Sequence, residues 1–67
     1  MDFTITIETN TTSEILESHE LLFDAKYWAS IYQSTKRVHY MFHDYAAIVI
    51  WQGEHLIEHL PFDFTGL

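Results

Sequence analysis

The chain has 67 residues, no cysteine, and a formal charge of −7 from ten acidic and three basic residues. The lack of cysteine excludes disulfides and thiolate metal sites, and the acidity argues against nucleic acid or an anionic membrane as a direct ligand, because both need counter-charge. Two tryptophans, four tyrosines and five phenylalanines are enough to fill one compact core, so we expect a single domain over residues 1–67.

The N-terminal segment predicts a strand and a cytoplasmic protein. Phe3, Ile5 and Ile7 alternate with polar residues, which is the period-two pattern of a half-buried strand. The segment has neither a basic start nor an apolar run, and no stretch reaches the roughly 18 apolar residues of a membrane helix. We therefore expect neither a signal peptide nor a transmembrane span, and a location in the cytoplasm, that of the host cell if the chain is phage-encoded.

A long helix is predicted next, from about Thr12 to about Ser34. Thr11 and Glu14 have the spacing of a capping box, in which each side chain satisfies a free backbone N–H at a helix start. One apolar face follows at steps of three and four residues. It consists of Leu21, Leu22, Ala25, Trp28, Ala29 and Tyr32. We expect Trp28 to anchor this face on the sheet.

The C-terminal half predicts three more strands. Residues 38–43 alternate again, residues 46–51 form a continuous apolar run that suits a central strand, and Gln52-Gly53 suits a tight turn. Residues 54–60 fit a last strand better than a short helix, since Pro61 follows at once. The predicted fold class is α+β, in the order β-α-β-β-β, with one helix packed on one face of a mostly antiparallel four-stranded sheet.

Four of the five histidines form two His-x-x-x-His pairs, His39 with His43 and His55 with His59. On a strand, residues four apart are about 13 Å apart, too far to share an ion bound at about 2 Å. We therefore predict no metal site and no cofactor. A helical segment or two opposed molecules would bring the rings together, so a small metal- or ligand-binding domain remains an alternative.

The strand register predicts an open sheet face. Two-residue turns would place the even-numbered residues of 46–51 on the face that carries the histidines, away from the helix. This face would be either an ordinary solvated surface or a homodimer interface. The candidate interface residues are His39, Met41, Ile48, Ile50 and Ile57.

Acidic residues gather in the first third of the chain. Glu14, Glu17, Glu20 and Asp24 would form a strip along the predicted helix, which suits docking to a basic protein partner, including one that binds nucleic acid. Carboxylates near a helix N-terminus also favour the helix dipole, so the strip has a structural explanation as well. No nucleophile elbow, phosphate loop or metalloprotease motif occurs, so we predict no catalytic residues and no enzyme.

A very small, acidic, cysteine-free α+β chain is similar in size and charge to phage-encoded inhibitors of host defence systems, such as anti-CRISPR proteins, and to some antitoxins. The resemblance implies an inhibitor or adaptor that binds a basic protein, with an antitoxin-like regulator as an alternative.

Overall fold

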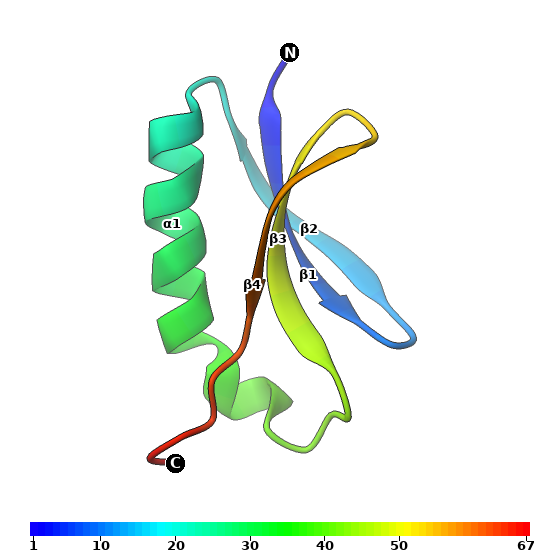
Figure 1. Cartoon of the computed structure of the whole chain (residues 1–67), viewed down its shortest axis with the longest axis vertical. Helices are drawn as coiled ribbons and strands as arrows, with labels where there is room; N and C mark the ends of the chain where they lie inside the picture. Colours follow the sequence, from blue (N-terminus) through cyan, green and yellow to red (C-terminus); the bar gives the residue numbers. More distant parts are fainter.

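The computed structural model describes all 67 residues and consists of a four-stranded sheet with one α-helix across one face (Figure 1). The elements are β1 (Phe3–Thr9), β2 (Ser13–His19), α1 (Leu22–Thr35), the 3₁₀ helix η1 (Arg37–Tyr40), β3 (Ala46–Gln52) and β4 (His55–Pro61). All neighbouring strands are antiparallel, in the order β2-β1-β3-β4. The predicted fold class is confirmed. The element order is β-β-α-β-β, which differs from the predicted β-α-β-β-β.

Residues 13–19 form an edge strand, so the prediction of a helix from about Thr12 is wrong. The Thr9 hydroxyl accepts hydrogen bonds from the backbone N–H groups of Thr11 and Thr12, and the Thr9 N–H donates to the Thr12 carbonyl at 2.8 Å. The hydroxyl-rich segment therefore closes a β-hairpin instead of capping a helix. A bulge at Leu16 interrupts the pairing of β2 with β1, and this irregularity hides the period-two pattern.

Residues 38–43 are not a strand. The chain instead makes η1 and a turn, in which the N–H of His39 donates to the Lys36 carbonyl and that of His43 to the Tyr40 carbonyl. Of the apolar residues in this segment, Tyr40 packs on the core and stacks on Phe62, with ring centroids 5.5 Å apart. The packed Tyr40 ring and a hydrogen bond from the Arg37 guanidinium to the Asp63 carbonyl, at 2.9 Å, hold this segment in place of a strand ladder.

The predicted strands β1, β3 and β4 are confirmed. The tight turn between β3 and β4 consists of Gly53 and Glu54 and not of Gln52 and Gly53, because Gln52 still pairs with His55. Gly53 has a φ of 61°, a conformation that favours glycine, and an added Cβ there would lie 3.1 Å from the Met1 sulfur. β1 begins beside the β3–β4 turn. Figure 1 shows the N-terminus, the β2–α1 turn and the β3–β4 turn at the same end of the molecule. No helix has the length and apolar character needed to cross a membrane.

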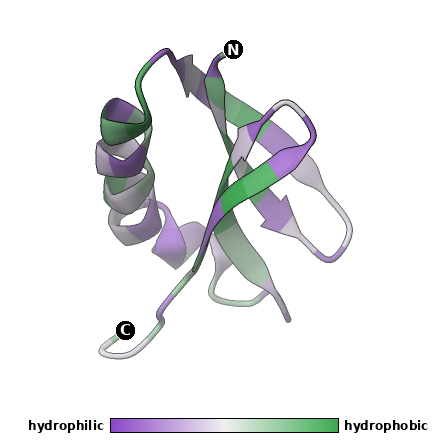
Figure 2. Cartoon of the chain, turned by 45° about the horizontal axis from the view of Figure 1, so that its top comes forward, coloured by the Kyte–Doolittle hydropathy of each residue, from purple (hydrophilic) through white to green (hydrophobic).

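The core lies between α1 and the two central strands. Ala25 and Ala29 are the buried residues of α1, and they pack against isoleucines of β1 and β3. Figure 2 shows that β3 is hydrophobic over much of its length. The four isoleucines are Ile5, Ile7, Ile48 and Ile50. Two methyl side chains let the helix approach the sheet closely. Trp28 is 41% exposed, so it is not the buried anchor that the helical pattern predicted.

The sheet faces are opposite to the prediction. Ile48 and Ile50 pair with core residues of β1 and are fully buried under α1, so they cannot form part of an open interface. Val49 and Trp51 lie on the face without a helix. Both faces of β3 are apolar, and hydrophobic pattern therefore could not decide which of them the helix covers.

Candidate functional site

Large aromatic residues of α1 point away from the core. Phe23 is 80% exposed, Tyr27 and Trp28 are about half exposed, and the Tyr27 and Trp28 rings make an edge-to-face contact with centroids 5.4 Å apart. Asp24 precedes Tyr27 by three residues and Trp28 by four, which places its carboxylate one turn above both rings. We call Phe23, Asp24, Tyr27 and Trp28 the aromatic-acid face.

This arrangement follows from the spacing of residues along the helix. At 100° per residue, Phe23 and Tyr27 fall opposite the line of Ala25 and Ala29, and Trp28 falls on the flank nearest β2. Lys26 is the basic residue of α1, and it lies on the other flank, where its ammonium pairs with Glu58 of β4 at 3.5 Å. The aromatic-acid face therefore carries a carboxylate and three rings without a cation.

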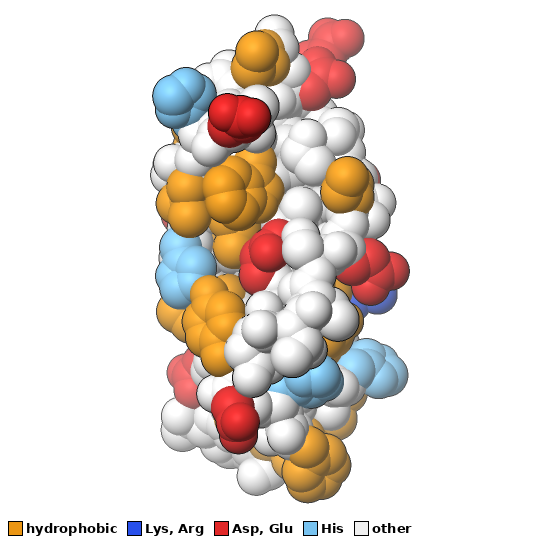
Figure 3. Space-filling model, turned by 90° about the vertical axis from the view of Figure 1, so that its right-hand side faces the viewer, with side chains coloured by type: hydrophobic (Ala, Val, Ile, Leu, Met, Phe, Trp, Pro, Cys, Tyr) orange, Lys and Arg blue, Asp and Glu red, His pale blue; other side chains and the backbone are white.

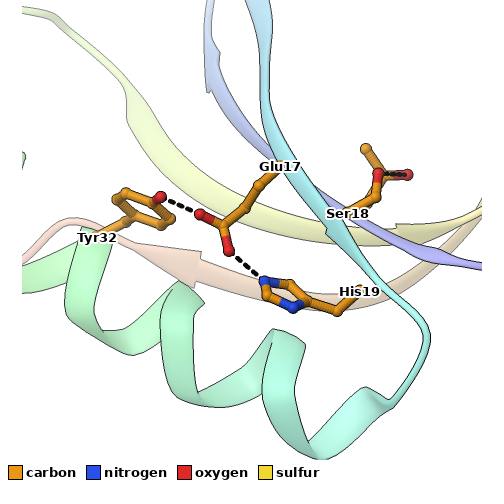
Figure 4. Close-up of polar contacts among 5 residues, drawn as sticks. Glu17, Ser18, His19 and Tyr32 are labelled. Atoms are coloured by element: carbon orange, nitrogen blue, oxygen red, sulfur yellow. Dashed lines mark hydrogen bonds and ion pairs between the residues drawn. The ribbon is translucent and has the colours of Figure 1, made fainter.

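Below Trp28, a polar cluster ties α1 to β2 (Figure 4). Tyr32 donates its hydroxyl proton to one carboxylate oxygen of Glu17, and the other oxygen contacts the Nε2 atom of His19. The Tyr32 ring also packs against Trp28 with centroids 6.4 Å apart. The cluster thus holds the Trp28 flank of the helix at a fixed position over the edge strand.

The pKa values of two members of this cluster respond to the contact. Partial burial of Glu17 raises the pKa of its carboxyl, but the hydrogen bonds from Tyr32 and His19 and the charge of His19 outweigh burial and hold that pKa below its usual value. The same hydrogen bond, with burial and the Glu17 charge, raises the pKa of Tyr32. The contact therefore favours an ionised Glu17 and a neutral Tyr32.

The sheet face opposite α1, which we call the open face, carries side chains from all four strands. They are Ser13, Ile15, Ser18, Thr4, Thr6, Glu8, Ala47, Val49, Trp51, Leu56 and His59. Figure 3 shows hydrophobic side chains mostly along one side of this face, with histidines on both sides and acidic side chains scattered over it. Ile15 is 70% and Leu56 53% exposed, on opposite edge strands.

Hydrogen bonds organise the polar part of the open face. The Trp51 indole donates to the Thr6 hydroxyl at 2.9 Å, Thr6 donates to the Glu8 carboxylate at 2.6 Å, and Ser13 donates to the same oxygen at 2.6 Å. Glu8 is therefore held by two donors. The network crosses three strands and fixes the orientation of the Trp51 ring.

The histidines are dispersed. His39 lies in η1, His43 in the following turn, and His55 at the start of β4. His59 stacks on Tyr45 with centroids 5.9 Å apart, and its Nε2 atom is 2.5 Å from the Tyr45 hydroxyl. No group of three or more His, Asp or Glu residues comes together in a way that could hold a metal ion, and no pocket is present.

The acidic residues predicted to form a helical strip do not share a helix. Glu14 and Glu17 lie on β2, Glu20 lies in the β2–α1 turn, and Asp24 lies in the first turn of α1. The strip is wrong as a geometric prediction because its first half belongs to a strand. The Glu17 carboxylate is occupied by Tyr32 and His19, whereas Glu20 and Asp24 are exposed beside Phe23.

The predicted interface residues are also dispersed. Ile48 and Ile50 are core residues, His39 and Met41 lie in and after η1, and Ile57 is the bulged residue of β4. The prediction that they share one open face is wrong, because residues 37–43 are not part of the sheet and the helix covers the even-numbered side of β3.

Phe23 and Tyr27 were missed by the sequence analysis, which sought one apolar helical face directed inward. Their spacing of four residues, on the side opposite two alanines, was the available signal. No family model, curated protein or solved structure matches the chain.

Proposed function

We propose that the chain is a non-enzymatic protein-interaction module, an inhibitor or adaptor, that binds a basic protein partner through the aromatic-acid face. The observation that carries this proposal is the position of Asp24 one helical turn above the exposed rings of Tyr27 and Trp28. A carboxylate beside exposed aromatic rings suits a lysine or arginine side chain, which would pair with the acid and lie over a ring.

The chain already contains one contact of this kind. The ammonium of Lys36 lies over the Tyr32 ring, 5.9 Å from its centroid, one turn below Trp28. Exposed rings further up the same helix present the same quadrupole to a cation from another molecule. Trp28 is the strongest candidate, because tryptophan is the best cation–π partner among the aromatic residues.

The overall charge supports the same class of partner. A net charge of −7 attracts a basic surface over a distance set by the ionic strength and raises the encounter rate. Glu20 lies just before α1 and adds a second free carboxylate at the Phe23 end of the face. A basic groove, including one that ordinarily holds nucleic acid, is complementary to this combination.

Calorimetry with an arginine-rich peptide as the probe tests the proposal. We expect Asp24→Asn and Trp28→Leu each to weaken binding by about 3- to 10-fold, the size of one exposed ion pair or cation–π contact. Asp44→Asn is the matched control, because it removes the same charge from an exposed turn at the far end of β3. It should change the affinity less than about twofold.

Equal losses for Asp24→Asn and Asp44→Asn would show that only net charge matters, and no effect of Trp28→Leu would remove the rings from the site. The same variants then serve in affinity capture of native partners. A partner of the proposed kind is retained by Asp44→Asn and lost with the Asp24→Asn, Trp28→Leu double variant.

A further inference from the structure

The three lysine and arginine side chains of the chain are all engaged within the chain itself. Lys26 pairs with a β4 carboxylate at 3.5 Å, and the ammonium of Lys36 lies over a ring of α1. The Arg37 guanidinium donates to backbone carbonyls of the C-terminal segment at 2.9 and 3.5 Å. None of these cations pairs with Asp24. A cation that binds the Asp24 carboxylate therefore has to come from another molecule.

The two rings beside Asp24 have different orientations. Tyr27 and Trp28 meet edge to face with an interplanar angle of 87°, so a flat group can lie parallel to only one of them. Trp28 is the better surface, because its ring is the larger one and Tyr32 packs against it. The Cβ atoms of Asp24 and Trp28, four residues apart on the helix, are about 5–6 Å apart. The carboxylate therefore lies beside the indole and not above it.

This sideways offset distinguishes a guanidinium from an ammonium. An ammonium is compact, so a lysine centred over the Trp28 ring is displaced from the Asp24 carboxylate, and one that pairs with the carboxylate leaves the ring. A guanidinium is planar, and when it stacks on a ring its N–H groups point outward, parallel to the ring, toward acceptors at the side. One arginine can thus contact Trp28 and Asp24 together, whereas a lysine contacts them in turn.

The exposure of the site acts in the same direction. Tyr27 and Trp28 lie on the convex outer surface of a helix, where a bound cation stays in contact with water. An ammonium is strongly hydrated and gains little from an exposed ring, but a guanidinium is weakly hydrated on its flat faces. Lys36 illustrates the limit for an ammonium on this helix, since its nitrogen is 5.9 Å from the Tyr32 centroid, close to the outer limit of about 6 Å for such contacts.

From these features we propose that the aromatic-acid face selects arginine over lysine, with one guanidinium stacked on Trp28 and paired with Asp24. The inference rests on the proposed function and narrows the partner to a basic protein segment with an accessible arginine. Trp28 lies in the second turn of α1, which begins at Leu22. The stacked cation therefore avoids most of the repulsion from the positive end of the helix dipole, which falls off within the first turn.

Calorimetry with two peptides of equal length and charge tests the selection. One alternates arginine with glycine and the other lysine with glycine. We expect the wild type to bind the arginine peptide about 3- to 10-fold more tightly, the size of one exposed stacking contact. Trp28→Leu should bring the two affinities together, whereas Asp24→Asn should weaken both. Phe42→Leu is the matched control, because it removes another exposed ring, in the turn after η1, and should leave the preference unchanged.

NMR of the wild-type complex provides a measurement that needs no variant. A guanidinium stacked on Trp28 places the neighbouring CH₂ protons of the arginine over the indole, so the ring current should shift their signals upfield. The corresponding protons of the lysine peptide should shift less. Equal shifts in the two peptides would contradict stacking.

The outcomes separate this inference from the proposed function. Equal affinities of the two peptides, both lowered by Asp24→Asn, overturn the selection of arginine and leave the binding of a basic partner in place. A preference for arginine that survives Trp28→Leu also overturns the inference, because the stacking surface would lie elsewhere. Failure of both peptides to bind the wild type overturns the proposed function, and the inference with it.

Discussion

Tyr32 of α1 donates a hydrogen bond to Glu17 of β2, and this contact joins the helix to an edge strand of the sheet (Figure 4). The two residues are 15 positions apart in the chain, so their contact closes the β2–α1 connection. Glu17 also contacts His19, and the carboxylate is thereby surrounded by two partners. The side of α1 that carries Trp28 is therefore held against β2 by the Tyr32 hydroxyl and the Glu17 carboxylate.

Removing the Tyr32 hydroxyl should destabilise the chain. Tyr32→Phe leaves the ring in place but deprives Glu17 of one donor, and hydrogen bonds to charged groups contribute about 1.5–3 kcal/mol when well shielded. Since the Glu17 side chain is 27% exposed, we expect about 1–2 kcal/mol in urea unfolding. Tyr27→Phe, on the outer side of the same helix, is the control and should cost less than about 0.5 kcal/mol.

The Glu17 contact should also make stability depend on pH. Contacts with Tyr32 and His19 hold the pKa of Glu17 below its usual value of 4.5, despite the opposing effect of burial. The resulting stabilisation is fully present above the unfolded-state value and is lost as the pH falls through the folded-state pKa. Urea unfolding of the wild type and Glu17→Gln between neutral and acidic pH measures this difference.

We expect the difference in the free energy of unfolding between the wild type and Glu17→Gln to become smaller as the pH falls. The pKa of Asp63 is also held low, by hydrogen bonds from Thr65 that outweigh a small effect of burial, with help from the charge of Arg37. Asp63 is present in both proteins and so cancels in the comparison. A gap that stays constant with pH would show that Glu17 has the same pKa in the folded and unfolded chain.

Enlarging an inward alanine of α1 should destabilise the fold. Ala29 is fully buried between the helix and the sheet, so Ala29→Leu introduces three carbon atoms where the helix already lies close to the strands. Overpacking of this kind costs about 1–3 kcal/mol. Thermal unfolding measures it, with Ser30→Leu as the exposed control. Equal melting temperatures would show that the helix can move outward without loss.

Residue size should be a poor guide to the cost of truncation. Ile50 is fully buried and Trp28 is 41% exposed. Ile50→Ala should therefore cost about 2–5 kcal/mol, and Trp28→Ala, although it removes a larger side chain, less than about 2 kcal/mol. Urea unfolding of both variants compares them. A larger loss for Trp28→Ala would restore it as the anchor of the helix.

Regular hydrophobic patterns made β1 and β3 predictable, because period-two alternation and a continuous apolar run have few alternative explanations. β2 lacks such a pattern. Its bulge places Leu16 and Glu17, which are neighbours in sequence, on the same helix-facing side of the sheet, and this breaks the period-two alternation. The hydroxyl-bearing residues before it are the same residue types that begin helices. Only pairing with β1, which is a tertiary effect, decides between strand and helix there.

The candidate site was predictable in its charge and unpredictable in its geometry. Asp24 and Glu20 were among the residues predicted to bind a partner, and the structure places both carboxylates on the surface; the basic partner itself stays a prediction. The aromatic residues were missed because pattern analysis assigns large apolar side chains to the core, whereas α1 presents alanines inward. The covered face of β3 could not be inferred because Ile48 and Val49 are equally apolar.

Because alanines form the inner side of α1, the residues that pack the helix on the sheet differ from those that it exposes to solvent. Ala25 and Ala29, which lie directly on the sheet, are small and buried, whereas Phe23 and Tyr27 project outward and are not part of the core. Sequence change at the outer positions therefore meets few constraints from folding. The same separation makes the outer side of α1 a suitable place for randomised libraries, in which new binding specificities are selected on an unaltered framework.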